Sequence, residues 1–483
     1  MKYALSAILA LLIFSIAVPA AANDSPVSSK TSLYWEYSED VLTKTEKVEG
    51  EIEWTLRGDY FTFFTRLGND WPFPGQEKEP EIEKRNVKFD MGSVDMTLGD
   101  FPVVLGRGII LNAKEDRPLG YDSMLDGSLF NVDVGRLDSV LFYGYHKTGS
   151  PNDFPVGVST IGDADLLWGG SLGYNFGITD VNLYYLHSYI GTETENNKDA
   201  FMGFDVSFKL DDWRFLYEHD FRDTFAGLDD GRAHYAEVSG GWPGLGVTLQ
   251  YKDYWNMDYS YGSPPRLRRG DTEEAAIHPK DDKGYMATLI YKPEFLGNSY
   301  LTGIFAASED TQRIFPFHEV YVEYQHDPLK DTTFNFGYDY VKGTLQSYNY
   351  LTGQYRDWNF GLDQSLGEDS FHLHLRFTEI DGSIGDEEEK ELGFDYNIGD
   401  DLTLGLFYEA STKEHEPPSL SGDQMPTKSP GEWFAFSMSY DINPSTILDL
   451  LWGSKRGGYE CSGGVCVQKP PFRGIQLVLR RFI

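Results

Sequence analysis

The sequence has no long apolar run beyond its N-terminus. Ala4–Val18 is apolar, follows Lys2 and precedes Ala20-Ala21-Ala22, as in a cleaved export signal. We therefore assign residues 1–22 to a signal peptide, with an uncleaved N-terminal anchor as the alternative. A membrane-spanning helix needs about 20 consecutive apolar residues. The rest of the chain is therefore not expected to be a helical membrane protein.

Cysteine is nearly absent from the sequence. The two that occur, Cys461 and Cys466, flank Ser-Gly-Gly-Val, and in an exported protein they are expected to form one disulfide. A metal-binding or redox-active pair is the alternative, although two cysteines without a nearby histidine seldom complete a tetrahedral site. No Cys-x-x-Cys-His motif occurs, so the chain attaches no c-type haem and the sequence predicts no cofactor.

Positive charge is also scarce. Lys and Arg number 41 against 76 Asp and Glu, which gives a formal net charge of -35. Such an acidic chain repels nucleic acid, so we exclude that class of partner. The excess of acid favours cations, basic partners or divalent ions, and a solvated acidic surface is the alternative.

The sequence contains none of the common catalytic motifs. It has no G-x-S-x-G elbow, no H-E-x-x-H and no phosphate-binding G-x-x-x-x-G-K-[ST]. Ser, His and Asp are scattered without a spacing that indicates a site, although a triad formed only in space leaves no trace in sequence. We therefore predict that the protein is not an enzyme.

Aromatic residues and glycine are abundant, by contrast. Aromatics make up 15% of the chain and there are 50 glycines. Apolar and polar residues alternate strictly in many segments, for example Met202–Leu210, Phe334–Tyr340 and Phe371–Phe377. A period of two places each set on one face of a β-strand. No fixed repeat period of a β-helix or propeller is present.

The connections between these segments alternate in length. Short turns rich in Gly, Pro, Asn and Asp, such as 211–212 and 399–401, alternate with longer polar stretches, such as 147–163, 255–283 and 412–431. This pattern is typical of outer-membrane barrels, with short periplasmic turns and longer extracellular loops. The sequence therefore predicts an all-β, transmembrane, antiparallel up-and-down β-barrel of about 22–24 strands over residues 23–483.

The polar residues of the alternating segments are expected to face an aqueous lumen. We predict Asp205, Lys209, His372, His374 and Arg376 as lumen-lining residues. The two histidines share one strand face and could hold a metal ion. No third ligand is evident, however, and the sequence predicts no metal site.

One segment, Gly99–Gly127, breaks the strand pattern. It is dense in glycine and charged residues around an apolar centre, Ile109–Leu111. We predict that it folds into or across the lumen as a constriction, because irregular backbone at membrane depth is tolerated only where protein or water covers it. The charged residues of this constriction would be Arg107, Glu115, Asp116 and Arg117. An ordinary strand pair with a long loop is the alternative.

These features resemble Gram-negative outer-membrane porins over essentially the whole chain. The segment Gly99–Asp122 is similar to a stretch found in a poorly characterised family of exported barrel proteins, which carries no known chemistry. The C-terminal strand, Ile475–Ile483, also fits, although its aromatic residue Phe482 is out of phase with the apolar positions. The size resembles the barrel components of porin–cytochrome conduits, which enclose a multihaem cytochrome.

Three functions are compatible with such a barrel. We expect a channel for passive passage of ions or small solutes, weakly cation-preferring, in the bacterial outer membrane. The alternative is a barrel sheath that holds a periplasmic or redox partner such as a multihaem cytochrome. A surface adhesin or lipid-handling barrel ranks lower, because the lumen-facing sets are polar. In each case the expected partners are outer-membrane lipids, lipopolysaccharide and the barrel-assembly machinery.

Overall fold

The computed structural model describes most of the chain after residue 26. The described ranges are 27–41, 45–71, 81–116, 121–146, 165–189, 198–224, 230–257, 261–262, 265, 282–293, 298–309, 316–329, 331–345, 351–382, 385–412, 431–456, 458–462, 465–469 and 472–482. The predicted signal peptide, residues 1–22, lies outside them. Within them, no helix is long and apolar enough to cross a membrane.

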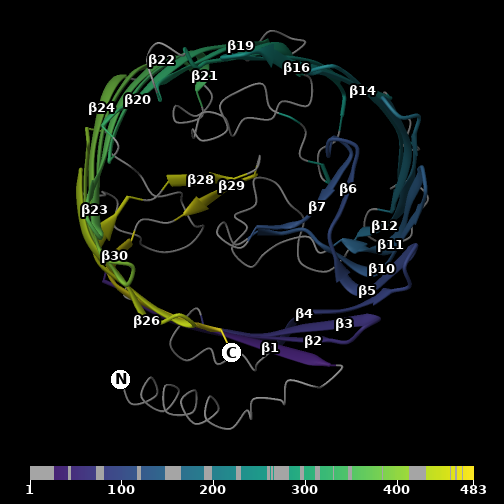
Figure 1. Ribbon diagram of the computed structural model, residues 1–483, viewed down its shortest axis with the longest axis horizontal. Helices are drawn as coiled ribbons and strands as arrows, with labels where there is room; N and C mark the ends of the chain where they lie inside the picture. The colour runs from purple at the N-terminus through teal and green to yellow at the C-terminus, as the bar shows by residue number, and fades with distance from the viewer. Residues whose placement is uncertain are drawn as a thin grey trace.

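The protein is a closed antiparallel β-barrel of 24 strands, which confirms the predicted fold class (Figure 1). Sequence neighbours pair around the wall, and β1 pairs with β30 to close the ring. The wall strands are β1 (Ser28–Asp40), β2 (Thr45–Arg57), β3 (Phe61–Trp71), β4 (Glu81–Asp90), β5 (Val94–Phe101), β10 (Leu125–Val134), β11 (Leu137–His146), β12 (Asp165–Asn175), β13 (Thr179–Tyr189), β14 (Lys198–Leu210), β15 (Trp213–Thr224), β16 (Gly231–Trp242), β17 (Leu245–Trp255), β18 (Asp282–Tyr291), β19 (Tyr300–Glu309), β20 (Phe317–Leu329), β21 (Thr332–Leu345), β22 (Leu351–Leu366), β23 (Asp369–Gly382), β24 (Gly385–Ile398), β25 (Leu402–Ser411), β26 (Glu432–Asn443), β27 (Thr446–Lys455) and β30 (Phe472–Phe482).

The outer face of the wall is apolar and rich in aromatic side chains. The alternating residues of each strand place large apolar groups outside, for example Leu141, Leu172, Leu289 and Leu406 in the exposed set. Aromatic residues lie toward both rims, as in the interfacial girdles of membrane barrels. Exposed aromatics toward the rim of the long connections include Tyr143, Trp168, Tyr285, Phe434 and Trp452, and those toward the other rim include Phe89, Tyr174, Trp242, Tyr291 and Phe482.

The connections differ in length between the two rims. Both β1 and β30 have their free ends at the rim where the connections are short, such as 58–60, 135–136 and 211–212. At the other rim the connections include 147–164, 256–281 and 412–431. In outer-membrane barrels the short turns and both termini face the periplasm.

Among the described residues, six short strands lie outside the wall sheet. They form three hairpins: β6 (Val103–Leu105) with β7 (Leu111–Ala113), β8 (Glu115–Asp116) with β9 (Tyr121–Asp122), and β28 (Gly458–Ser462) with β29 (Val465–Lys469). Figure 1 draws β6 and β7 inside the ring, on the side of β10 to β14. The first two hairpins belong to the connection between β5 and β10, and the third belongs to the connection between β27 and β30.

The register of β28 and β29 bears on the predicted disulfide, since Cys461 is paired directly with Cys466. Opposite residues of antiparallel strands have Cα atoms roughly 4.5–5.5 Å apart, which is within the range of a disulfide. We therefore expect non-reducing peptide mapping of protein extracted from membranes to recover a Cys461–Cys466 cross-link. In a Cys461→Ser control Cys466 becomes alkylatable. Alkylation of both thiols in unreduced wild-type protein contradicts the prediction.

Candidate functional site

The chain leaves the barrel wall at the start of the predicted constriction segment. Gly99 has a φ of +96°, and a Cβ atom there would lie 2.1 Å from the carbonyl oxygen of Arg85. Only glycine tolerates both conditions. Two residues later β5 ends at Phe101, and β10 resumes the wall at Leu125, so residues 102–124 are inserted between two paired strands.

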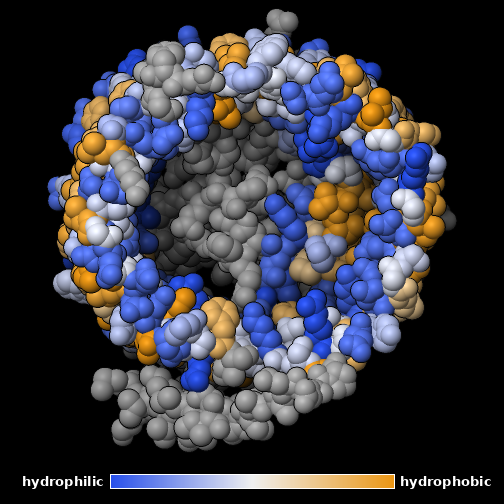
Figure 2. All heavy atoms as spheres, in the orientation of Figure 1, coloured by the Kyte–Doolittle hydropathy of each residue, from blue (hydrophilic) through white to orange (hydrophobic). Residues whose placement is uncertain are grey.

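The inserted segment is held inside the barrel by an apolar core. Ile109, Ile110 and Leu111 are completely buried. They belong to one cluster with inward residues of strands β10 to β17, among them Leu125, Leu167, Leu186, Phe201, Ala233 and Tyr254. Figure 2 shows apolar side chains gathered inside the ring on the side where Figure 1 draws β6 and β7. Burial of each such side chain stabilises docking by roughly 1.5–3 kcal/mol.

Residues that follow β17 cover the hairpin of β6 and β7. The backbone N–H of Asn112 donates a hydrogen bond to the carbonyl oxygen of Tyr261 over 2.8 Å. The Tyr261 hydroxyl donates to Asp165 at the start of β12, also over 2.8 Å. Met257 and Tyr261 are both part of the apolar cluster. The hairpin is therefore enclosed between the wall and a second inward-folded stretch.

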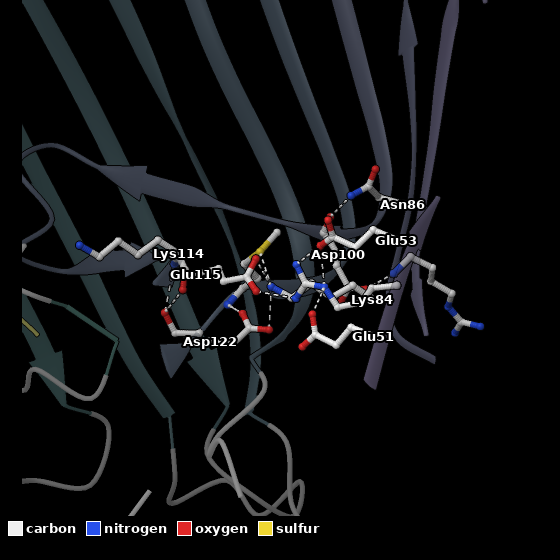
Figure 3. Close-up of polar contacts among 12 residues, drawn as sticks. Glu51, Glu53, Lys84, Asn86, Asp100, Lys114, Glu115 and Asp122 are labelled. Carbon is white, nitrogen blue, oxygen red and sulfur yellow. Dashed lines mark hydrogen bonds and ion pairs between the residues drawn. The ribbon is translucent and has the colours of Figure 1, made fainter. Parts of the chain in front are cut away.

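An ion-pair network fixes one end of the segment to strands β2 to β4 (Figure 3). Glu115 lies 2.6 Å from a guanidinium nitrogen of Arg66 and 2.7 Å from the ammonium of Lys84. Arg66 also contacts Glu53 at 2.7 Å, and Lys84 contacts Asp122 at 3.0 Å. Both cations are buried, and each contacts a second carboxylate, so the network spreads their charge over several partners.

A second polar network holds the turn between β6 and β7. The backbone N–H of Arg107 donates to both carboxylate oxygens of Glu218 over 3.1 and 3.0 Å. Its guanidinium donates to Glu237 over 2.8 Å and lies over the ring of Tyr235. Tyr235 and Gln250 also donate to Glu237, over 2.8 and 3.0 Å. These partners lie on β15, β16 and β17.

Of the predicted constriction residues, Arg107 and Glu115 therefore contact the wall and not each other. Arg107 and Glu115 lie in the two separate networks just described. The side chain of Asp116, whose backbone belongs to β8, and the whole of Arg117 lie outside the described residues. Sequence reasoning missed the wall partners Arg66, Lys84, Glu218 and Glu237, and it missed the apolar docking. The available signal was the alternation of apolar and polar residues along β3 and β4, which places Arg66 and Lys84 on the inner face.

The predicted lumen-lining residues lie on the inner face by register. On β14, Asp205 and Lys209 alternate with the outer-face residues, and Asp205 is paired with Glu218 of the neighbouring strand β15. On β23, His372 Nδ1 lies 2.6 Å from Asp363, His374 Nδ1 lies 3.5 Å from Glu391, and Arg376 Nε lies 2.8 Å from Asp357. Each of these three basic side chains thus contacts a carboxylate of a neighbouring strand.

The inner face of strands β20 to β25 is markedly acidic. Among the described inner-face positions of these strands, Arg376 is the only Lys or Arg. The carboxylates on the same face are Glu319, Glu323, Asp339, Asp357, Asp363, Glu387, Glu389, Glu391, Asp395 and Glu409. Arg456, which follows β27, adds contacts to Glu389 and Glu409 at 2.6 and 2.9 Å. Across the described parts of the chain, no three His, Cys, Asp or Glu side chains are placed to hold a metal ion.

The apolar core of the hairpin can be tested with Ile110→Ala. Truncation of a fully buried isoleucine costs about 2–5 kcal/mol. That cost falls on hairpin docking, because the wall hydrogen bonds are untouched. We expect faster amide hydrogen exchange across residues 103–113, with unchanged heat-modifiable migration of the barrel in gel electrophoresis. Val104→Ala, at an exposed position of the same hairpin, is the matched control. Unchanged exchange in Ile110→Ala contradicts the assigned docking.

The network around Glu115 predicts a response to acid. Burial acts to raise the pKa of this carboxyl, but Arg66 and Lys84 outweigh it, and the pKa lies below its ordinary value of 4.5. The stabilisation is therefore fully present above the ordinary value and is lost as the pH falls through the lowered one. We expect hydrogen exchange of residues 111–116 to accelerate over that interval. In Glu115→Gln the exchange should be fast at both ends of it. A wild-type profile without this acid limb refutes the assignment.

Comparison with known proteins shows similarity in fold but no match to a known sequence family. No known family profile and no curated protein matches the chain. A chain of the E. coli P pilus tip assembly intermediate PapC-PapD-PapK-PapG is similar with a TM-score of 0.53 and 9% identity; the match covers 96% of this chain and 62% of that one. Matches with lower TM-scores include the P pilus usher (PapC) translocation pore (0.44, 9% identity, 94% of this chain and 99% of that one) and Pseudomonas aeruginosa OccK11 (0.32, 9% identity, 95% and 96%).

The chain spans less than two thirds of the P pilus assembly chain that it matches, 62%. At 9% identity this likeness concerns the fold alone. It agrees with the closed ring of strands and with the apolar, aromatic outer face described above. The protein is an outer-membrane β-barrel.

Proposed function

We propose that this barrel is a channel for passive passage of small solutes, with a preference for cations. A ring of 24 strands is wide enough to enclose an aqueous lumen unless something fills it. The hairpin of β6 and β7 occupies part of that space on the side of β10 to β17. The path for solutes then lies between the docked hairpin and the opposite wall.

The observation that carries the proposed selectivity is the acidic inner face of β20 to β25. These strands lie across the ring from β6 and β7 in Figure 1. Some of their charged side chains are accessible to solvent, for example Asp363 at 48% and His372 at 41%. A surface of one sign facing a confined aqueous path raises the local concentration of the opposite ion. Cations are therefore enriched along this wall.

The alternative of a sheath around an inserted redox protein has less support. A partner that filled the whole lumen would have to displace the hairpin, whose apolar residues Ile109, Ile110 and Leu111 are fully buried against the wall. It would also break the contacts of Glu115 with Arg66 and Lys84. A solute channel uses the lumen with these contacts in place.

The proposal is tested by reversal potentials in planar bilayers under a potassium chloride gradient. Neutralisation of three inner-face carboxylates in Glu323→Gln/Asp363→Asn/Asp395→Asn should lower the permeability ratio of cation to anion, because the enriching charge is removed. The matched control is Glu379→Gln/Asp381→Asn/Glu388→Gln, which removes three charges from outer-face positions of β23 and β24. Its ratio should equal that of the wild type. A barrel that conducts no ions, or a ratio that falls equally in both variants, refutes the proposal.

A further inference from the structure

Two carboxylates lie buried side by side beneath the turn of the inward hairpin. Glu218 and Asp220 are inner-face neighbours on β15, and both are 0% exposed. Glu218 accepts the two hydrogen bonds from the backbone N–H of Arg107. Neither oxygen of Asp220 has a hydrogen-bond partner among the described residues, and the same holds for the hydroxyl of Tyr184, which is 4% exposed. Asp205, on the neighbouring strand β14, is paired with Glu218 and is 7% exposed.

The nearby guanidinium groups are engaged with other carboxylates. Arg107 directs its guanidinium to Glu237 at 2.8 Å. Arg222, the next inner-face residue on β15, contacts Asp199 at 2.7 Å. A carboxylate taken out of water without a counter-charge costs several kcal/mol, so the pair Glu218 and Asp220 requires positive charge from another source.

Two glycines leave room for the oxygen atoms of this cluster. A Cβ atom at Gly106, in the hairpin turn, would lie 2.2 Å from Glu218 Oε1 and 2.8 Å from the Tyr184 hydroxyl oxygen. A Cβ atom at Gly203, on β14, would lie 2.1 Å from Asp220 Oδ1. Gly203 is paired with Asp220 on one side and with Tyr184 on the other. The oxygens of Glu218, Asp220 and Tyr184 therefore lie close together around these two glycines, in the space between the hairpin turn and the wall strands.

We propose that this space is a binding site for a hard divalent cation of the calcium type, held by Asp220, Glu218 and Tyr184. All three side chains present oxygen, the donor that such cations prefer. The two carboxylates together balance the charge of a divalent cation. A single proton shared between them would leave one negative charge buried. Two of the three proposed ligands are carboxylates, and no third His, Cys, Asp or Glu side chain of the described residues completes a metal cluster with them. Water completes the coordination, as is common for calcium.

The ion would tie the hairpin to the wall, because Glu218 is both a ligand and the acceptor for the backbone N–H of Arg107. Loss of the ion leaves the charges of Glu218 and Asp220 to repel each other beneath Gly106. The site thus couples cation binding to the docking of the inward segment. The proposal does not depend on whether the barrel conducts.

The test uses full-length protein refolded in detergent free of lipopolysaccharide. Calcium binding is measured by isothermal titration calorimetry, and terbium, a hard substitute for calcium, is measured by luminescence sensitised through tyrosine. We expect one site per chain. Asp220→Asn, which keeps the side-chain volume, should weaken calcium binding by roughly tenfold or more, because ligand charge tunes calcium affinity. Tyr184→Phe should lower the sensitised terbium signal.

The matched control is Asp138→Asn, an exposed inner-face carboxylate on β11, which should bind calcium as the wild type does. Hydrogen exchange at residues 103–113 should rise on chelation in the wild type and be high in Asp220→Asn with or without calcium. Heat-modifiable migration confirms that each variant forms a barrel. Equal calcium affinity in Asp220→Asn and Asp138→Asn overturns the proposal. So does exchange at residues 103–113 that responds to pH but not to calcium.

Discussion

The structure depends on one constraint, which is that every backbone N–H and C=O group of the wall must be hydrogen-bonded inside the hydrocarbon layer. Lipid offers no partners, so a sheet that spans it must close on itself. The pairing of β1 with β30, from Ser32 with Phe482 to Asp40 with Gly474, removes the two free edges. The closed ring then separates two environments, and alternation along each strand assigns one set of side chains to lipid and the other to the interior.

The interior of this ring is itself divided into two kinds of surface. On the side of β10 to β17 an apolar cluster among the inward residues holds the hairpin through Ile109, Ile110 and Leu111, and both positive and negative side chains lie around it. On the side of β20 to β25 the charged inward residues are carboxylates, with Arg376 as the one Lys or Arg among the described strand positions. If the inner face of the barrel were acidic all round, it would offer no apolar surface to hold the hairpin. This difference lets one side of the wall hold the hairpin while the other side keeps its carboxylates toward the interior.

The fold was predictable from sequence because its signal is local. In Met202–Leu210 the alternation alone fixes the faces of β14, and the same period recurs in most other strands. The inward course of the segment from Gly99 was also predictable, since its density of glycine and charge does not suit a strand facing lipid. The partners of that segment were not predictable. Arg66 and Glu115 are 49 residues apart, and Arg107 and Glu218 are 111 apart, so only the pairing of the intervening strands brings them together.

The hairpin and the wall residues that hold it also come from one part of the sequence. Its described wall partners, from Glu53 on β2 to Gln250 on β17 and the covering residue Tyr261, precede β18, and Met286 on β18 packs against the edge of the apolar cluster. A sheet that holds the strands up to β18 therefore carries the docking surface before β30 pairs with β1. A segment seated at that stage is enclosed as the ring closes around it. With that order of strand addition, the hairpin would not have to be threaded into a closed barrel.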